Sequence, residues 1–347
     1  MDDGGGPQWS KLNTTYQAAF FDDQPPLYPW PNLLRSSGLS RVCKPREAMW
    51  KYALEGLGMV QGDRVLDVGC GTGVWLDRLK KHFGIRGIGV DISKSSLKTA
   101  VSKSSPELGF LCGDGPHLPF TEGYFDVVVS LDVLEHVEDQ KGCLREMTRV
   151  LKPGGSFFLW TLNRAQRYTW NWWLDKIGID IYDRVAHDPM LLPDVSKVRD
   201  LLDNSGMVVN RLVPFNSFFT LAMDEAIMLI VSAFDKLGLF ETEGWLSRNL
   251  GKGFLATVDL FSRSALPFLS WLDRPWTRRG YSNGVLVIAR RNADRAVGLR
   301  NCDSFEEQFG AGIPAGSISN NFSLRLTRCE DEWADSKLQG VATWMKK

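Results

Sequence analysis

The chain has no excess of either charge, since 41 Lys and Arg are balanced by 41 Asp and Glu over 347 residues. Proteins that coat nucleic acid need a surplus of basic side chains to neutralise phosphates, so we expect no nucleic-acid partner. The six cysteines include no C-x-x-C pair, and the chain has only four histidines. Neither a zinc knuckle nor a disulfide framework is indicated, and we expect no metal site.

Long apolar runs are also missing. The N-terminal residues MDDGGGPQW lack the apolar segment of a secretory signal. The most apolar stretch, 226–234, is too short to span a bilayer and is bracketed by charged residues. We therefore expect a cytoplasmic protein whose contact with a membrane, if it has one, is peripheral. Hydrophobic residues make up 44% of the chain, which is enough for a core, and its thirteen tryptophans are unusual.

Strand-like and helix-like segments alternate through the middle of the chain. Nearly unbroken apolar runs separated by amphipathic helices are typical of a parallel sheet covered on both faces. The pattern predicts an α/β fold: a doubly wound, Rossmann-like sheet of seven mostly parallel strands, with a helical insertion before the last strand. Strands are expected over 64–70, 85–92, 108–114, 125–131, 155–162, 207–213 and 284–291, and helices over 74–83, 95–103, 142–152 and 193–206.

The composition divides the chain into a body and flanking segments. Residues 1–44 contain the run PPLYPWP and predict an extended N-terminal arm, whereas 45–291 form the body. Within the body, 214–280 is apolar and aromatic without strand alternation, which indicates a helical insertion. The polar residues 292–347, with the run GSISNNFS, predict a loosely attached C-terminal tail.

A glycine-rich turn follows the first predicted strand in VLDVGCGTG, with Gly69, Gly71 and Gly73. Glycine permits a tight turn and lets backbone amides approach a ligand. A dinucleotide fingerprint needs its third glycine where this chain has Val74, and it places a pyrophosphate where Asp67 would repel it. Spacing and charge therefore favour a ligand with a cationic sulfonium and ammonium over a nicotinamide dinucleotide.

Several motifs in order resemble the class I S-adenosylmethionine-dependent methyltransferases, over roughly 45–214 and the last strand. LDVGCGTG resembles their glycine-rich loop, GVDIS their second motif, GDGPHLPF their adenine segment, and FDVVVSLDVLEHV with RVLKPGGSFF their fourth and fifth strands. The resemblance implies S-adenosyl-L-methionine as cofactor, with Asp91 at the ribose hydroxyls and Asp114 at the adenine amino group. The cofactor-binding residues that it implies are Asp67, Gly69, Cys70, Gly71, Gly73, Asp91, Ile92, Asp114, Gly115 and Leu131.

The acceptor side is less well defined. Methyl transfer is an in-line displacement, so the protein mainly aligns the acceptor and excludes water, and a hydroxyl acceptor also needs a base. His136 and His187 are the candidate catalytic bases, each with the alternative of a structural or loop histidine. We predict transfer to a hydroxyl oxygen of a small-molecule or lipid-like acceptor. The alternatives are a C- or N-methyltransferase and a non-catalytic subunit that only binds the cofactor.

A narrower resemblance begins at TLNR (161–164), followed by the loop that bears His187. This stretch is similar to the O-methyltransferases of ubiquinone biosynthesis, which implies a catechol-like hydroxyl on a prenylated ring, although Ala186 stands where that family has threonine. The segments 167–182 and 214–280 allow three interpretations: a lid over an apolar acceptor, a peripheral membrane contact, or core packing of an extra helical layer. The sequence leaves these open and does not define the oligomeric state.

Overall fold

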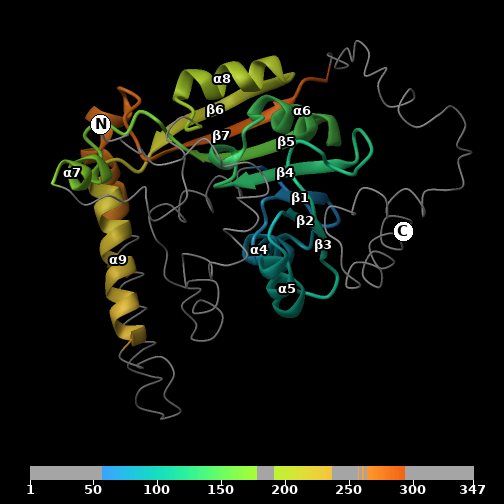
Figure 1. Ribbon diagram of the computed structural model, residues 1–347, viewed down its shortest axis with the longest axis horizontal. Coiled ribbons are helices and arrows are strands. Elements are labelled where there is room, and N and C mark those ends of the chain that lie inside the picture. The colour runs from blue at the N-terminus through green and yellow to red at the C-terminus, as the bar shows by residue number, and fades with distance from the viewer. Residues whose placement is uncertain (1–56, 178–190, 237–256, 258–259, 262–263, 294–347) are drawn as a thin grey trace, which may run out of the picture.

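The computed structural model of the chain describes residues 57–177, 191–236, 257, 260–261 and 264–293 (Figure 1). The arm anticipated at 1–44 and nearly all of the tail anticipated at 292–347 lie outside these residues. His187 and residues 178–182 of the segment 167–182 also lie outside them.

A seven-stranded sheet forms the centre of the molecule. Its strands are β1 (Arg64–Val68), β2 (Arg86–Asp91), β3 (Gly109–Cys112), β4 (Phe125–Leu131), β5 (Leu151–Leu162), β6 (Met207–Phe215) and β7 (Gly284–Arg291). Their order is β3-β2-β1-β4-β5-β7-β6, and every neighbouring pair is parallel except the two that β7 makes with β5 and β6. The predicted fold class is confirmed.

Helices cover both faces of the sheet, as Figure 1 shows. They are α4 (Val74–Phe83), α5 (Lys94–Lys103), α6 (Gln140–Val150) and α8 (Val195–Asn204). Alternate residues of β1 point to opposite faces: Leu66 and Val68 belong to the core under α6 and α8, whereas Val65 belongs to the core under α4. The two apolar layers explain why the strands read as nearly continuous apolar runs.

Local signals set the ends of these helices. Left-handed Gly73 and Gly84 flank α4, so this helix has the bounds that the sequence predicts. Ser93, Asp139 and Asp194 accept a hydrogen bond from a backbone N–H three residues later and so cap α5, α6 and α8. The fifth strand begins earlier than expected, because Leu151 pairs with Phe125 before a register shift.

The anticipated insertion leaves and re-enters the sheet at one point. Phe215, the last residue of β6, pairs with Gly284, the first residue of β7. Between them lie α9 (Phe219–Lys236), helical residues 264–272 and α11 (Arg274–Thr277), with α7 (Trp170–Lys176) beside α9 at the same end of the molecule (Figure 1). No helix in the described part of the chain has the length and apolarity needed to cross a membrane.

A buried carboxylate fastens this helical layer to the body. Asp273 is 1% exposed and accepts hydrogen bonds from the backbone N–H groups of Phe218, Phe219 and Thr220, at 3.1, 2.9 and 3.0 Å, and from the Thr220 hydroxyl at 2.5 Å. It therefore caps the N-terminus of α9 from more than fifty residues away. The first N–H groups of a helix have no partner within the helix, so this carboxylate supplies one.

We expect Asp273→Ala to lower the free energy of unfolding by about 2–4 kcal/mol, because buried N–H groups lose a charged acceptor. Denaturant titration measures the loss. Asp200→Ala on the exposed face of α8 is the matched control and should change stability by less than about 0.5 kcal/mol. Equal effects of the two substitutions would contradict the capping role.

Candidate functional site

The turn between β1 and α4 brings three glycines to the carboxyl edge of the sheet. Gly69, Gly71 and Gly73 all have positive φ, at 77°, 50° and 72°. A Cβ on Gly69 would lie 2.0 Å from a methyl carbon of Val133, in the loop after β4, so only glycine fits there. A Cβ on Gly71 would meet nothing within 4 Å, so this turn has open space beside it. The turn thus touches the β4 loop and leaves room for a ligand.

Asp91 joins this turn to the second strand. Its carboxylate accepts the N–H of Gly71 at 2.7 Å and the N–H of Ser93 at 2.8 Å. The residue ends β2 and is half-buried, as is its neighbour Ile92. Carboxylate oxygens can accept more than one hydrogen bond each, so Asp91 retains acceptor capacity for the paired hydroxyls of a ribose.

Asp67 is a buried acid next to Asp91. It is 3% exposed, and desolvation, reinforced by the negative charge of Asp91, raises its pKa to about 7. A cationic group placed here would favour the ionised form and relieve the cost of burying it. Asp67 therefore fits a ligand that carries an ammonium or sulfonium and fits a pyrophosphate poorly.

The side chain of Cys70 is buried in the fold. Its thiol packs over Gly89, where an added Cβ would lie 2.5 Å from the sulfur. Burial raises the pKa of this thiol well above its ordinary range, with Asp91 and Asp67 adding to the effect, so it stays protonated. Any contact of Cys70 with a ligand at the turn would come from its peptide group.

The predicted adenine segment lies against α6. Asp114 pairs with the Nδ1 atom of His117 at 3.0 Å, and its side chain is 19% exposed. Gly115 leaves no space for a side chain, because a Cβ would lie 2.5 Å from the sulfur of buried Cys143. This close approach holds the backbone of the segment beside α6 and keeps Asp114 near the carboxyl edge.

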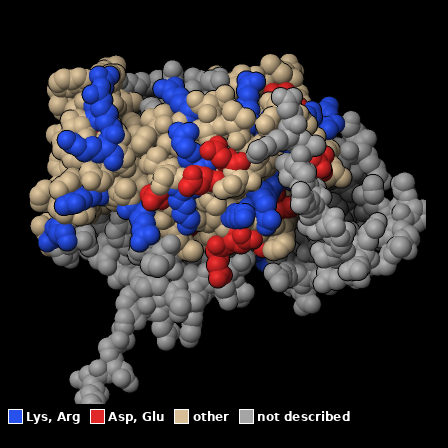
Figure 2. Space-filling model, turned by 90° about the horizontal axis from the view of Figure 1, so that it is seen from above, with Lys and Arg blue, Asp and Glu red and all other residues tan. Residues whose placement is uncertain are grey.

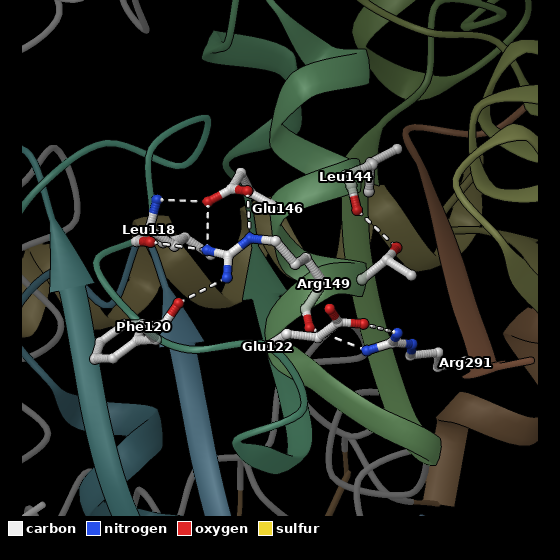
Figure 3. Close-up of polar contacts among 8 residues, drawn as sticks. Leu118, Phe120, Glu122, Leu144, Glu146, Arg149 and Arg291 are labelled. Atoms are coloured by element: carbon white, nitrogen blue, oxygen red, sulfur yellow. Dashed lines mark hydrogen bonds and ion pairs between the residues drawn. The ribbon is translucent and has the colours of Figure 1, made fainter. Parts of the chain in front are cut away.

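A polar cluster holds the other end of this segment, as Figure 3 shows. The Arg149 guanidinium donates to the Leu118 and Phe120 carbonyls at 3.0 and 2.7 Å and to the Glu146 carboxylate at 2.6 Å. Glu146 in turn accepts the Leu118 N–H at 3.1 Å. Arg291 of β7 extends the cluster by donating to the carbonyls of Arg149 and Leu151 and pairing with Glu122. Sequence reasoning missed this cluster, because only the pair of Glu146 and Arg149 is close in the chain and the other partners are distant.

The loop after β4 carries the remaining candidates. Leu131 ends the strand, and Asp132 follows with a left-handed φ of 54°, an uncommon conformation that is frequent at functional sites. A short 3₁₀ helix, η3 (Leu134–His136), then places half-buried His136 near this edge. Because Val133 touches Gly69, the structure brings His136 and the glycine-rich turn into one neighbourhood.

Glu135 is fully buried and ties this loop to the end of β5. Its carboxylate accepts the Thr161 hydroxyl at 3.0 Å and the Leu162 N–H at 3.1 Å. Desolvation and the nearby charge of Asp132 raise the pKa of Glu135 to about 8. These contacts assign Glu135 to holding the loop in place. Of the predicted bases, His187 lies outside the described residues, and His136 is the one whose position the structure gives.

The TLNR stretch has a structural role. Asn163 is fully buried, and its amide donates to the Gly280 carbonyl at 2.7 Å and to the Ser282 hydroxyl at 3.0 Å. Its oxygen accepts the Ala165 N–H at 3.1 Å. Asn163 thus ties the end of β5 to the start of β7. No His, Cys, Asp and Glu side chains in the described part of the chain are grouped to hold a metal ion.

Comparison with known proteins relates the chain to methyltransferases. Residues 66–159 match the family model described as a methyltransferase domain. The 2-methyl-6-phytyl-1,4-hydroquinone methyltransferase of Synechocystis sp. is 27% identical over 203 residues, which cover 57% of this chain and 60% of that protein. The ubiquinone/menaquinone biosynthesis C-methyltransferase UbiE of Edwardsiella ictaluri is 33% identical over 168 residues, 45% of this chain and 64% of that protein. The chain thus matches less than two thirds of the length of these curated relatives.

A solved structure shows the same fold. Phosphoethanolamine N-methyltransferase 2 of Haemonchus contortus, in complex with S-adenosyl-L-methionine, superposes with a TM-score of 0.51 and 17% identity. The match covers 78% of this chain and 60% of that one. At this identity the likeness concerns the fold alone.

Arg149→Met should lower the free energy of unfolding by about 2–4 kcal/mol, because it leaves Glu146 and two carbonyls without their donor. Thermal and denaturant unfolding measure this effect. Arg145→Met, an exposed position on the same helix, is the control and should cost less than about 0.5 kcal/mol. If the two variants proved equally stable, the cluster would not be what holds residues 118–120.

Proposed function

Because residues 66–159 form a methyltransferase domain of the class I S-adenosylmethionine-dependent family, we propose that this chain transfers a methyl group from S-adenosyl-L-methionine to a small, apolar acceptor with an aromatic hydroxyl. The observation that carries the proposal is the pair of carboxylates at the glycine-rich turn. Buried Asp67 matches the cationic amino-acid part of that cofactor, and Asp91, fixed by Gly71 and Ser93, matches its ribose. Asp114 and Gly115 would then border the adenine.

The cofactor supplies a methyl group already activated by the positive sulfonium. The work left to the chain is to orient the acceptor, exclude water and accept the hydroxyl proton. We assign the last role to His136, because it lies in the loop that touches the glycine-rich turn. A phenol has a pKa of about 10, so a nearby base makes the phenolate accessible near neutral pH.

For the acceptor we propose a hydroquinone-like ring with a prenyl-type chain. Two relatives support this class, because their names specify a phytyl hydroquinone and ubiquinone or menaquinone biosynthesis. A phenolate shares its negative charge between the oxygen and the ring carbons. Either atom of the same deprotonated acceptor can therefore receive the methyl group, and the orientation of the ring decides which one does. The TLNR resemblance supports the expected transfer to oxygen. However, the side chain of Asn163 in that stretch forms its hydrogen bonds with other residues of the protein, which gives it a structural role. We therefore favour the ring carbon, as in the name of the Edwardsiella relative. After the transfer, this carbon loses its ring proton and the oxygen regains a proton, which restores the aromatic hydroxyl.

The direct test uses methyl-labelled cofactor with a prenylated hydroquinone in detergent micelles and, separately, with the same ring lacking its chain. We expect label in the prenylated product as a ring methyl, which NMR distinguishes from a methoxy group. A methoxy product would restore the oxygen prediction. Cofactor binding without transfer to either acceptor, or to an extract of host lipids and metabolites, would favour the non-catalytic alternative.

Asp91→Ala should weaken binding of S-adenosylhomocysteine by about 100-fold or more, because it removes a charged acceptor and releases the Gly71 turn. Isothermal titration calorimetry measures this affinity. Asp203→Ala, an exposed position on α8, is the control and should bind as the parent does. Unchanged affinity in a folded Asp91→Ala variant would remove Asp91 from the site.

Cofactor affinity should depend on pH through Asp67. In the free protein the raised pKa, about 7, keeps Asp67 protonated at lower pH, whereas the bound ammonium favours its ionised form. Binding of S-adenosylhomocysteine should therefore tighten as pH rises toward 7, by up to about tenfold per pH unit, and then level off. Asp67→Asn should flatten this dependence. An identical pH profile in the variant would contradict the pairing of Asp67 with the ammonium.

A further inference from the structure

The helical layer before β7 has an outward face that combines aromatic and basic residues. Phe268 and Trp271 are 60% and 55% exposed, and their rings stack with centroids 6.0 Å apart. Arg274 and Arg278 continue the same face at helical spacing and are also exposed. The opposite face is turned inward, since Leu266 packs against the core and Asp273 is buried.

Further apolar side chains are exposed nearby. Trp173 on α7 and Ile177 directly after it are 48% and 69% exposed, next to exposed Lys176. Leu260 and Phe261, which precede residues 264–272, are 68% and 64% exposed. Six of the eight large apolar side chains exposed in the described part of the chain thus belong to α7, to the residue after it or to the insertion. A soluble surface rarely carries such a concentration without a partner.

Ring contacts place α7 and the insertion side by side. Trp170 packs edge-on against Phe218 at 5.5 Å, and Phe218 stacks on Trp276 of α11 at 6.5 Å. Tyr168 contacts Tyr281 at 5.8 Å. These inward-facing aromatics form a rigid base, so the outward-facing Trp173, Phe268 and Trp271 are presented on a packed layer and not on a lone helix.

Basic side chains predominate on one face of this end of the molecule among the described residues. Figure 2 shows Lys and Arg side chains over the end that carries α7 and the insertion, with no Asp or Glu of the described residues among them on that face. The acidic residues Asp224 and Asp273 of this region are buried and bonded to Asn216 and to the start of α9. Glu225 on α9 is exposed. Exposed aromatic rings bordered by arginines match the interface of an anionic bilayer, where rings lie at headgroup depth and guanidinium groups meet phosphates.

We propose that the face formed by Trp173, Phe268, Trp271, Arg274 and Arg278 docks on the surface of a membrane that carries anionic lipid headgroups. The insertion begins and ends at the carboxyl edge of the sheet, because Phe215, Gly284 and Leu162 are paired neighbours there. A docked membrane would therefore lie on the side of the molecule where the candidate active site opens. The docking needs no methyl transfer and stands apart from the proposed function.

The test is co-sedimentation of the full chain with vesicles of phosphatidylcholine alone or mixed with phosphatidylglycerol, without cofactor or acceptor. We expect binding to the anionic vesicles that weakens at high salt, because exposed charges are screened. Arg274→Gln with Arg278→Gln should weaken it about 25-fold, since each basic residue near an anionic surface contributes about fivefold. Phe268→Ser with Trp271→Ser should weaken it at least about tenfold.

Matched controls use residues of the same types elsewhere on the surface. Val60→Ser with Val208→Ser removes two exposed apolar side chains, and Arg86→Gln with Arg199→Gln removes two exposed arginines. Both controls should bind vesicles as the parent does. Absence of vesicle binding by the parent, or equal losses in test and control variants, would overturn the proposal. The parent protein could instead fail to bind vesicles but form dimers that Phe268→Ser with Trp271→Ser disrupts. That result would assign this face to self-association and would also overturn the proposal.

The outcomes separate this proposal from the enzymatic one. If the chain binds anionic vesicles but methylates no acceptor, the docking proposal stands and the proposed function is wrong. If the chain methylates a micellar acceptor but does not bind anionic vesicles, the proposed function stands and the proposed docking surface is wrong.

Discussion

The carboxylate of Asp91 is the contact on which the candidate site depends. It accepts N–H groups from Gly71 in the first turn and from Ser93 at the start of α5, and so joins two βα units at one edge of the sheet. Parallel pairing of β1 and β2 forces the second acid, Asp67, to lie nearby in a buried position. The free protein therefore carries an acid whose pKa is raised to about 7, and a cation bound beside it would favour the ionised form. Burying an acid without a cationic partner lowers the stability of the fold, and such a group is expected at a binding site rather than in a structural core.

Sequence reasoning succeeded where the determining signal is local. Gly73 and Gly84 bound α4 at the predicted residues, and parallel topology alone brings the strand ends carrying Asp91 and Asp114 to one edge. It failed where the partner is distant. Arg149 binds a carbonyl 31 residues away and Asp273 caps a helix 54 residues away, and no spacing rule relates such positions. Glu135 likewise binds Thr161 and Leu162, 26 and 27 residues away, because the β4 loop folds back over the end of β5.

The tryptophans illustrate why composition alone left three interpretations open. Trp160 of β5 is fully buried in the core, and Trp170 packs against Phe218 within the helical layer. Trp173 and Trp271 belong to the same helical layer, but they face outward. Core packing and an exposed surface therefore coexist within one segment, and which side a residue faces depends on helical phase and on neighbours from another part of the chain.

The connectivity of the sheet separates the cofactor candidates from the helical insertion. The cofactor candidates lie at the ends of β1, β2, β3 and β4, whereas the helical insertion joins β6 to β7 at the opposite end of the strand order. Because Phe215 and Gly284 are paired, the insertion closes on itself at the sheet and its internal sequence can change without altering strand register. The two halves meet at the loop after β4, where Val133 touches Gly69 and Glu135 holds the end of β5. The cofactor candidates all lie within the matched residues 66–159, whereas the insertion lies outside them, so the sequence of the insertion can differ without changing the cofactor edge.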